Sequence, residues 1–195
     1  MTTKLSNLRI KLSTGQIQAR KEHKGADSPT FSYSVLVPRA IKDGTIDHSL
    51  LSSFEGLKSD YEDLKLTKKG DIVIKNSTPY DACIIEYGDD GLFIPSFCIL
   101  LENEDPNVDS YYLLAFLNSK KVKERFSSYG SGRLAIINKK CILDLDFPMV
   151  DIYKQNEIGG RYKKSIEKIK SMKKIVSLEQ EWYDTYFEND GKESC

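Results

Sequence analysis

The sequence predicts an α+β protein, in which a mixed β-sheet domain with short helices is followed by one long C-terminal helix that pairs as an antiparallel coiled coil. Three observations support this fold class. Short apolar runs separated by turn residues fill the first half of the chain, helical apolar spacing begins near residue 110, and no proline occurs from 155 to 187. We expect a domain over residues 1–150, a pairing helix over 151–188 and a disordered tail over 189–195.

The first hundred residues carry the pattern of short strands joined by turns. Turn signals lie at residues 69–71, where a glycine precedes an aspartate, and at 88–91, where two glycines flank two aspartates. Because the apolar runs follow one another closely, we expect a β-meander. The runs lie at residues 8–12, 34–37, 72–75, 83–87, 92–94 and 97–101.

Helical spacing replaces strand alternation after residue 108. Asp109 can cap a helix that carries apolar residues from Tyr112 to Leu117, and Ser119 can cap a second, basic helix over 120–128. In the second helix Val122 and Phe126 are expected to face the core. A flexible loop over 129–133, a short strand over 134–137 and an extended exit over 145–148 are expected to follow.

The long C-terminal helix is the clearest element. Over about 30 residues it would span roughly 45 Å, which is longer than a small domain can cover. One apolar stripe follows it at steps of three, four or seven residues, so we expect a partner helix; the alternative is that the stripe packs back on its own domain. The stripe consists of Tyr162, Ile166, Ile169, Met172, Val176, Tyr183 and Tyr186, and Ile175 and Trp182 widen it.

Composition excludes several classes of protein. No run approaches the roughly 18 apolar residues that span a bilayer, and the N-terminus has no apolar signal core, so we expect a cytoplasmic protein. The four cysteines form no Cys-x-x-Cys pair and only His23 and His48 are histidines, so we expect no metal site. Phosphate-binding loops, dinucleotide-binding motifs and nuclease motifs are absent, and residues 76–80 only poorly approximate an amino-methyltransferase motif. A chain without catalytic residues of its own is expected.

The formal net charge of zero conceals strong segregation of charge. Residues 1–42 carry 8 basic and 2 acidic residues, and residues 110–174 carry 15 and 6. Residues 43–109 carry 5 basic and 15 acidic residues, and residues 175–195 carry 1 and 6. If the two basic segments meet in space, they form a cationic face suited to a phosphate backbone; the alternative is that they are ordinary solvated surfaces.

In their order and spacing these motifs resemble the specificity subunits of type I restriction-modification systems. Residues 66–74 are similar to the family's turn and strand, residues 112–119 to its Leu-Asn-Ser helix end, and residues 130–148 to its Gly-Ser loop and extended exit. Gln155 stands where the family has the glutamine that opens its spacer helix. The chain departs from the family in having Pro148-Met149-Val150 in place of Pro-x-Pro, and in having one recognition domain and one helix where the family has two of each.

The resemblance implies a half-subunit that pairs through its helix and reads a two-part site in double-stranded DNA. It implies no cofactor on this chain, with S-adenosylmethionine and ATP carried by a methyltransferase partner and an endonuclease partner. The implied base-reading residues are Gln18, Arg20, Asn76, Ser77 and Arg133, and the implied phosphate contacts are Lys21, Lys24, Lys75, Lys121 and Arg125. Ser131 is a further implied DNA contact. The alternatives are a homodimeric scaffold without sequence-specific binding, and a regulatory or donor fragment of a full-length subunit.

Overall fold

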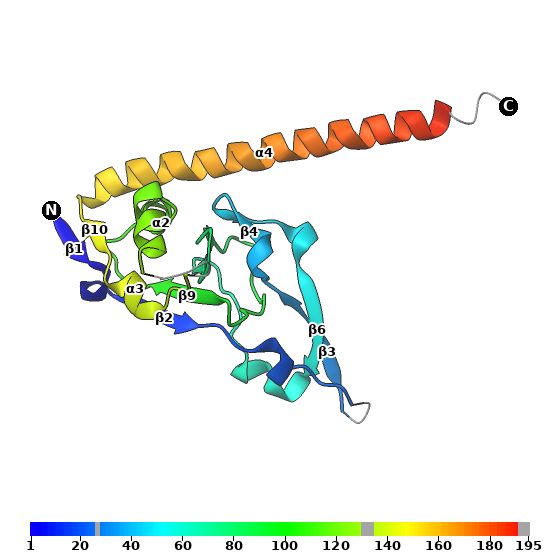
Figure 1. Cartoon of the computed structure of the whole chain (residues 1–195), viewed down its shortest axis with the longest axis horizontal. Coiled ribbons are helices and arrows are strands. Elements are labelled where there is room, and N and C mark those ends of the chain that lie inside the picture. The colour runs from blue at the N-terminus through cyan, green and yellow to red at the C-terminus, as the bar shows by residue number, and fades with distance from the viewer. Residues whose placement is uncertain (26–27, 130–134, 191–195) are drawn as a thin grey trace.

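A computed structural model describes residues 1–25, 28–129 and 135–190. A four-stranded sheet forms the centre of the domain, a two-stranded arm projects from it, and the long helix α4 (Ile152–Asp190) lies across the side opposite the arm (Figure 1). The mixed sheet-and-helix domain followed by a long helix confirms the predicted fold class. The helix ends two residues later than predicted, and residues 191–195 of the expected tail lie outside the described residues.

The central sheet is antiparallel but is not the predicted meander. Its order is β2 (Ile10–Thr14), β9 (Cys98–Asn103), β7 (Ile72–Lys75) and β8 (Ala82–Ile84). The side chains of β7 are buried on both faces of the sheet, with Ile72 and Ile74 in one core and Val73 in the other. The backbone N–H and C=O groups of a strand buried in this way need hydrogen-bond partners on both edges. β8 pairs with one edge of β7, and β9 pairs with the other.

Smaller strand pairs surround this sheet. The arm consists of β3 (Thr30–Val35) and β6 (Ser52–Leu57), and β1 (Thr2–Lys4) pairs with β10 (Asp146–Pro148) where the domain begins and ends. The short hairpin of β4 (Ile41–Lys42) and β5 (Thr45–Ile46) turns at Gly44. Single 3₁₀ turns lie between the strands, at Leu5–Asn7, Gln18–Arg20, Pro38–Ala40, His48–Leu50 and Lys58–Asp63. Residues 92–94, expected to be a strand, form only isolated bridges through Phe93.

The two predicted short helices and their caps are confirmed. The Asp109 carboxylate accepts from Tyr112 N (2.7 Å) to cap α1 (Ser110–Leu117), and the Ser119 hydroxyl accepts from Val122 N (3.4 Å) to cap α2 (Lys120–Ser127). Between them, the Asn118 amide accepts from Ala82 N (2.9 Å) and donates to Ala82 O (3.0 Å). This side chain thereby supplies the edge strand β8 with the hydrogen bonds that a further strand would make.

The segment after the Gly-Ser loop differs from its prediction. Residues 135–137 form no strand, and the chain instead enters a short helix, α3 (Lys139–Leu143), capped by Asn138. Ile137 is buried, and its N–H donates to Asn76 O (2.7 Å). The predicted strand is therefore absent from the described residues 135–137, and Ile137 is anchored by a loop and not by a sheet.

The start of α4 is fixed to the domain by a buried glutamine and a glycine. Gln155 is completely buried: its side-chain oxygen accepts from Asp109 N (3.1 Å), and its side-chain nitrogen donates to Asn107 O (2.9 Å) and Val150 O (2.8 Å). One turn later, a Cβ on Gly159 would lie 2.1 Å from Asp109 Oδ1. Only glycine allows α4 to approach the beginning of α1 this closely.

Further along α4, one apolar contact and two ion pairs hold the helix. Ile166 is buried, and a Cβ on Gly44 would lie 2.7 Å from its Cδ1. Glu86 accepts from Tyr111 Oη (2.8 Å) and from Lys170 Nζ (2.9 Å), and Lys173 pairs with Asp43 at 2.6 Å. Together with the contacts of Gln155 and Gly159, these contacts extend over about five turns of the helix, so α4 has a defined direction relative to the sheet.

Replacing Gln155 with Leu should lower the free energy of unfolding by about 3 kcal/mol or more, because one buried N–H and two buried carbonyls lose their partners. Urea unfolding followed by fluorescence measures the change. The matched control is Asn156→Leu at the exposed neighbouring position of the same helix, which should change stability by no more than about 0.5 kcal/mol. Equal effects of the two substitutions would show that the buried amide does not hold the helix.

Glu86 predicts a pH dependence of stability. Burial raises its pKa, but the hydrogen bonds from Lys170 and Tyr111 and the nearby lysine charges outweigh burial and hold the pKa below its ordinary value. The ionised carboxylate therefore contributes stability above the unfolded pKa, near 4.3, and loses it as the pH falls through the lower folded value. Glu86→Gln should destabilise the chain at pH 7 and progressively less toward pH 3, measured by denaturant titration against Glu167→Gln; a constant difference across this range would contradict the assignment.

Candidate nucleic-acid and helix-pairing surfaces

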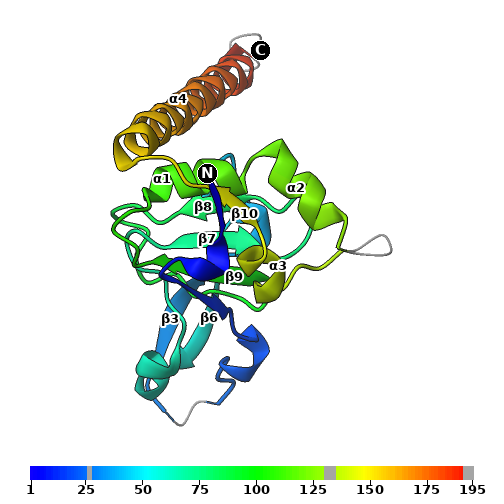
Figure 2. The ribbon, with the colours of Figure 1, turned by 90° about the vertical axis from the view of Figure 1, so that its left-hand side faces the viewer.

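Residues 16–24 and 75–80, the two loops that carry the implied DNA contacts of the first half of the chain, meet at one end of the central sheet. β2 and β7 end there and β8 and β9 begin there, because neighbouring strands are antiparallel. Backbone hydrogen bonds link the loops in a row, from Ser96 N to Gln16 O (2.8 Å), from Asn76 N to Phe97 O (3.0 Å) and from Ile137 N to Asn76 O. Figure 2 shows α2, α3 and the 3₁₀ turn at Gln18–Arg20 along this side of the domain. We call it the loop face.

Exposed cations from both basic segments lie on the elements of the loop face. Arg20 and Lys24 come from the segment that runs beside the arm, where His23 N donates to Glu55 O, and Lys121 and Arg125 come from α2. Sequence reasoning missed Lys139 and Lys140, which are exposed on α3, and the apolar side chains of Phe97 (61% exposed) and Ile136 (63% exposed). A recognisable signal for the two lysines was present, since they directly follow the cap residue Asn138.

The structure contradicts two predicted contacts. Lys75 is only 7% exposed and its ammonium lies 3.0 Å from Asp81, so it cannot reach a phosphate in this arrangement. Asn76 is also buried; its amide nitrogen donates to Ser96 O (3.3 Å), and its side-chain oxygen has no partner among the described residues. Both residues hold the loop face together instead of projecting from it.

The other predicted DNA contacts differ in how far their side chains are exposed to solvent. Gln18, Lys21 and Ser77 are half-buried, so only part of each side chain is accessible. Arg125 lies over the Tyr129 ring, 4.9 Å from its centroid, and 3.9 Å from Asp144, which leaves it exposed but oriented. Ser131 and Arg133 lie outside the described residues.

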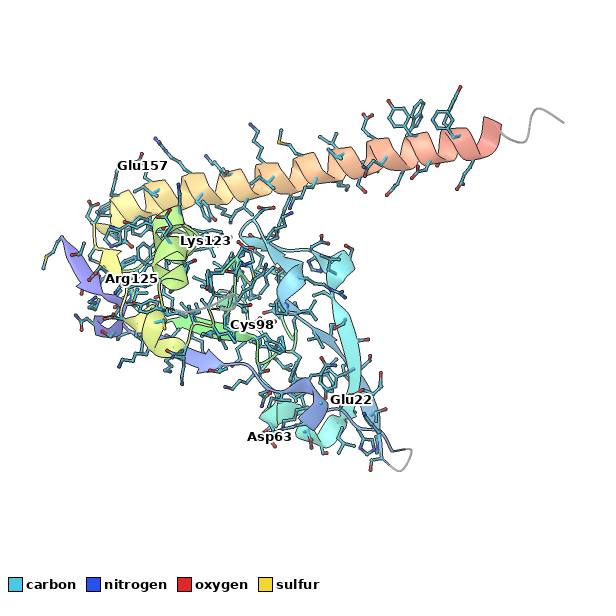
Figure 3. The ribbon with its side chains drawn as sticks, in the orientation of Figure 1. Glu22, Asp63, Cys98, Lys123, Arg125 and Glu157 are labelled. Atoms are coloured by element: carbon cyan, nitrogen blue, oxygen red, sulfur yellow. The ribbon has the colours of Figure 1, made fainter. Side chains whose placement is uncertain are left out.

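The predicted apolar stripe on α4 divides into two parts. Tyr162 and Ile166 pack against the domain, so the prediction that they contact a partner helix is wrong, and the alternative of packing back on the domain holds for this part. Beyond Lys173 every described side chain of the helix is exposed, and Figure 3 shows this distal part extending past the domain. The large exposed side chains there are Met172, Ile175, Val176, Leu178, Trp182, Tyr183, Tyr186 and Phe187, and Ile169 is half-buried at the boundary.

These distal side chains occupy two neighbouring faces of the helix. Ile169, Met172 and Val176 line one shallow hollow, and Ile175, Leu178 and Trp182 line another. Trp182 stacks on Tyr186, with ring centroids 5.5 Å apart. A single partner helix covers about one face, so the distal part of α4 offers contact surface for more than one neighbour.

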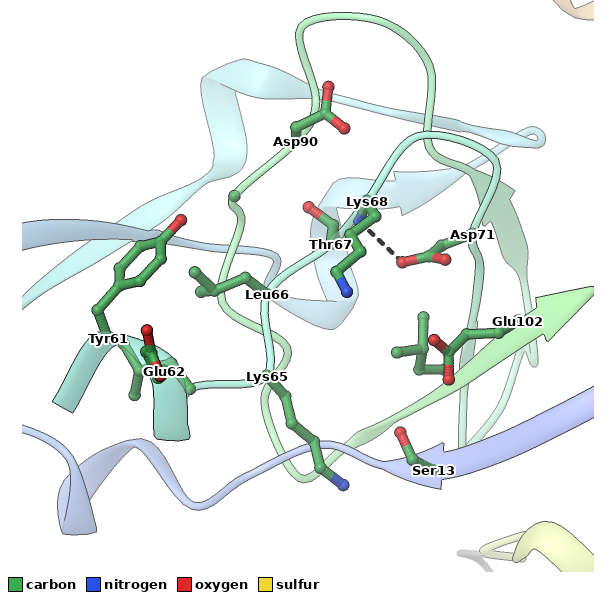
Figure 4. Close-up of a pocket in the computed structure, with 13 residues that line it drawn as sticks. Ser13, Tyr61, Glu62, Lys65, Leu66, Thr67, Lys68, Asp71, Asp90 and Glu102 are labelled. Carbon is green, nitrogen blue, oxygen red and sulfur yellow. Dashed lines mark hydrogen bonds between the residues drawn. The ribbon is translucent and has the colours of Figure 1, made fainter.

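A separate hollow of about 490 Å³ lies between residues 61–71 and the strands β2 and β9, and no residue of α4 lines it (Figure 4). Its lining mixes the carboxylates of Glu62, Asp90 and Glu102 with lysines, and burial raises the pKa of Asp71, which accepts from Lys68 N (2.8 Å). Such a lining does not favour a phosphate backbone. Over the described residues, no three His, Cys, Asp or Glu side chains group as metal ligands, and no helix there has the length and apolarity to cross a membrane.

Comparison with known proteins gives matches only to solved structures. No family model and no curated protein matches the sequence. The HsdS subunit from Thermoanaerobacter tengcongensis superposes with a TM-score of 0.62 at 12% identity, covering 95% of this chain and 47% of that one. The type I restriction-modification S subunit from M. genitalium gives a TM-score of 0.59 at 14% identity, with 95% and 44% covered.

A third similar chain comes from a structure that describes complex assembly and conformational transition of the type I restriction-modification system. Its TM-score is 0.58 at 15% identity, with 95% of this chain and 43% of that one covered. The present chain therefore spans less than half the length of each of these neighbours, as expected for a half-subunit. The resemblance carried by the sequence motifs is confirmed at the level of the fold: the chain has the fold of type I restriction-modification specificity subunits, over one of their halves.

Proposed function

We propose that the chain is a non-catalytic, sequence-specific DNA-binding half-subunit of a type I restriction-modification system. The observation that carries this proposal is that 95% of the chain follows the fold of specificity subunits while covering less than half of each. Two copies paired through α4 would present two loop faces to a two-part site in double-stranded DNA. The protein would act in the cytoplasm.

The distribution of charge along α4 favours antiparallel pairing of two copies. Residues 152–174 carry 8 basic and 2 acidic residues, whereas residues 175–190 carry 5 acidic and no basic residues. An antiparallel pair places the acidic end of each helix beside the basic half of the other. Ile169, Met172, Val176 and Tyr183 then form the seam.

The second apolar face of α4 supports a further partner. Ile175, Leu178 and Trp182 remain exposed when the seam is filled, and a large apolar patch on a soluble protein usually marks a binding site. We assign this face to the methyltransferase subunit, which an ATP-dependent endonuclease subunit can join. S-adenosylmethionine and ATP are bound by those partners and not by this chain.

On the loop face, side chains divide into base-reading and phosphate-holding groups. Gln18, Arg20 and Ser77 remain proposed base readers, since their side-chain types can recognise base edges in the major groove. Arg133 also stays a proposed base reader and Ser131 a proposed DNA contact, and both lie outside the described residues. Lys21, Lys24, Lys121 and Arg125 remain the proposed phosphate contacts, and the structure adds Lys139 and Lys140 to them. Lys75 and Asn76 are removed from both groups because they are buried.

Ile169→Glu combined with Val176→Glu should convert the purified dimer into a monomer at micromolar concentration. Each substitution places a carboxylate in an apolar seam at a cost of several kcal/mol. Light scattering measures the mass. The matched control, Lys174→Glu, lowers the net charge by the same two units at an exposed residue that lines neither hollow and should leave the dimer intact; a wild-type chain that is already monomeric would contradict the pairing.

Lys121→Ala should weaken binding to every duplex by a similar factor and lower the slope of log affinity against log salt by about one unit, because one phosphate contact is lost. A fluorescence titration at several salt concentrations, with and without the methyltransferase, measures both quantities. Lys174→Ala on α4 is the control and should leave the slope unchanged. DNA binding that does not depend on salt, or its absence even with the methyltransferase, would favour the homodimeric scaffold.

A further inference from the structure

A nearly buried ion cluster connects the central sheet to α2. The carboxylate of Asp81 receives Lys75 Nζ on one oxygen (3.0 Å) and Lys123 Nζ on the other (2.5 Å). Lys75 is the last residue of β7, Asp81 precedes β8, and Lys123 lies in the middle of α2. One carboxylate therefore joins three elements.

The cluster carries one negative and two positive charges. The side chains of Lys75 and Asp81 are 9% and 14% exposed, and that of Lys123 is 30% exposed. Removing the carboxylate would leave Lys75 buried without a counter-ion, which is far more costly than losing an ion pair at the surface. The ammonium of Lys123 can turn into solvent, but α2 then loses its charged contact with the sheet.

The same short segment also fixes the beginning of α2. The Asn118 amide is bonded to both backbone groups of Ala82, the residue after Asp81, and Ser119 caps the helix. Phe126 at the far end of α2 packs on Tyr80, the residue before Asp81. Residues 80–82 thus contact α2 near its start, middle and end, and the contact in the middle is the charged one, between Asp81 and Lys123.

We propose that Asp81 is a positioning residue for DNA binding, which holds α2 so that Lys121 and Arg125 are presented on the loop face. Lys75 and Lys123 are its counter-ions and make no contact with DNA. This inference rests on the proposed function, but the position of α2 can be measured without DNA. The proposal also predicts an effect opposite to that of charge alone: removing the negative charge of Asp81 should weaken binding to DNA, a polyanion.

The test compares Asp81→Asn with Asp63→Asn, which removes an exposed carboxylate from the same protein. Electrostatics alone predicts that both substitutions tighten binding to a 30-base-pair duplex, because both raise the net charge by one. The positioning role predicts that Asp81→Asn weakens binding several-fold, that Asp81→Glu restores most of it, and that Asp63→Asn does not weaken it. Hydrogen exchange of the α2 amides, measured without DNA, should accelerate in Asp81→Asn but not in Asp63→Asn.

Lys123→Gln provides a second variant, because it releases α2 while leaving Lys75 paired with Asp81. It should accelerate exchange in α2 and weaken binding, whereas Lys121→Ala should weaken binding and leave the exchange of α2 unchanged. Unchanged exchange of α2 in both Asp81→Asn and Lys123→Gln, or binding by Asp81→Asn as tight as wild type, would overturn the proposal. If the wild-type chain binds no DNA, the proposed function fails, and the exchange experiment still decides whether Asp81 positions α2.

Discussion

The rest of the structure depends on the attachment of α4 to the domain through the buried amide of Gln155. This one side chain satisfies three backbone groups at the point where the domain ends and the helix begins. Unpaired, each of these groups would destabilise the joint, so the helix has one favourable way to leave the domain. The close approach at Gly159 and the contact of Ile166 with the β4–β5 hairpin then extend this single direction over several turns.

A fixed joint determines how the exposed surfaces relate to one another. The loop face lies at one end of the central sheet, and the distal part of α4 projects beyond the domain (Figures 1 and 2). If two such chains pair through their helices, the separation of their loop faces is set by the helix and not by a flexible linker. A reader of a two-part DNA site needs this property, because the spacing between half-sites is a geometric quantity.

Sequence reasoning succeeded where structure is decided by near neighbours along the chain. The caps at Asp109 and Ser119, the buried positions of α2 and the extent of α4 follow from side-chain type and spacing within a few residues. The order of the sheet strands could not be predicted in this way, since β2 and β9 meet across about 90 residues and their pairing is decided by burial of β7. The pairing of β1 with β10 is similarly non-local.

In the candidate site, too, features set by neighbouring residues could be predicted from the sequence, and those set by tertiary contacts could not. The resemblance implied that Lys75 contacts DNA, but its ammonium instead pairs with Asp81, which lies six residues later on the other side of a turn. The apolar stripe on α4 was predicted correctly as a stripe, but periodicity does not reveal its partner. Tyr162 and Ile166 face the domain, and only the later turns remain free.

The most direct test of a fixed joint is a distance measurement between spin labels on the arm, at Ser53, and on the distal helix, at Glu181, which is exposed and lines neither apolar hollow. Cys141 and Cys195 are replaced by Ser, the buried Cys83 and Cys98 are kept, and labelled chain is diluted into unlabelled chain so that only distances within one chain are recorded. We expect one narrow distance distribution that does not change when DNA is added and that broadens in Gly159→Val. A broad or multiple distribution in the wild-type chain would show that the helix moves relative to the domain, and would contradict the account.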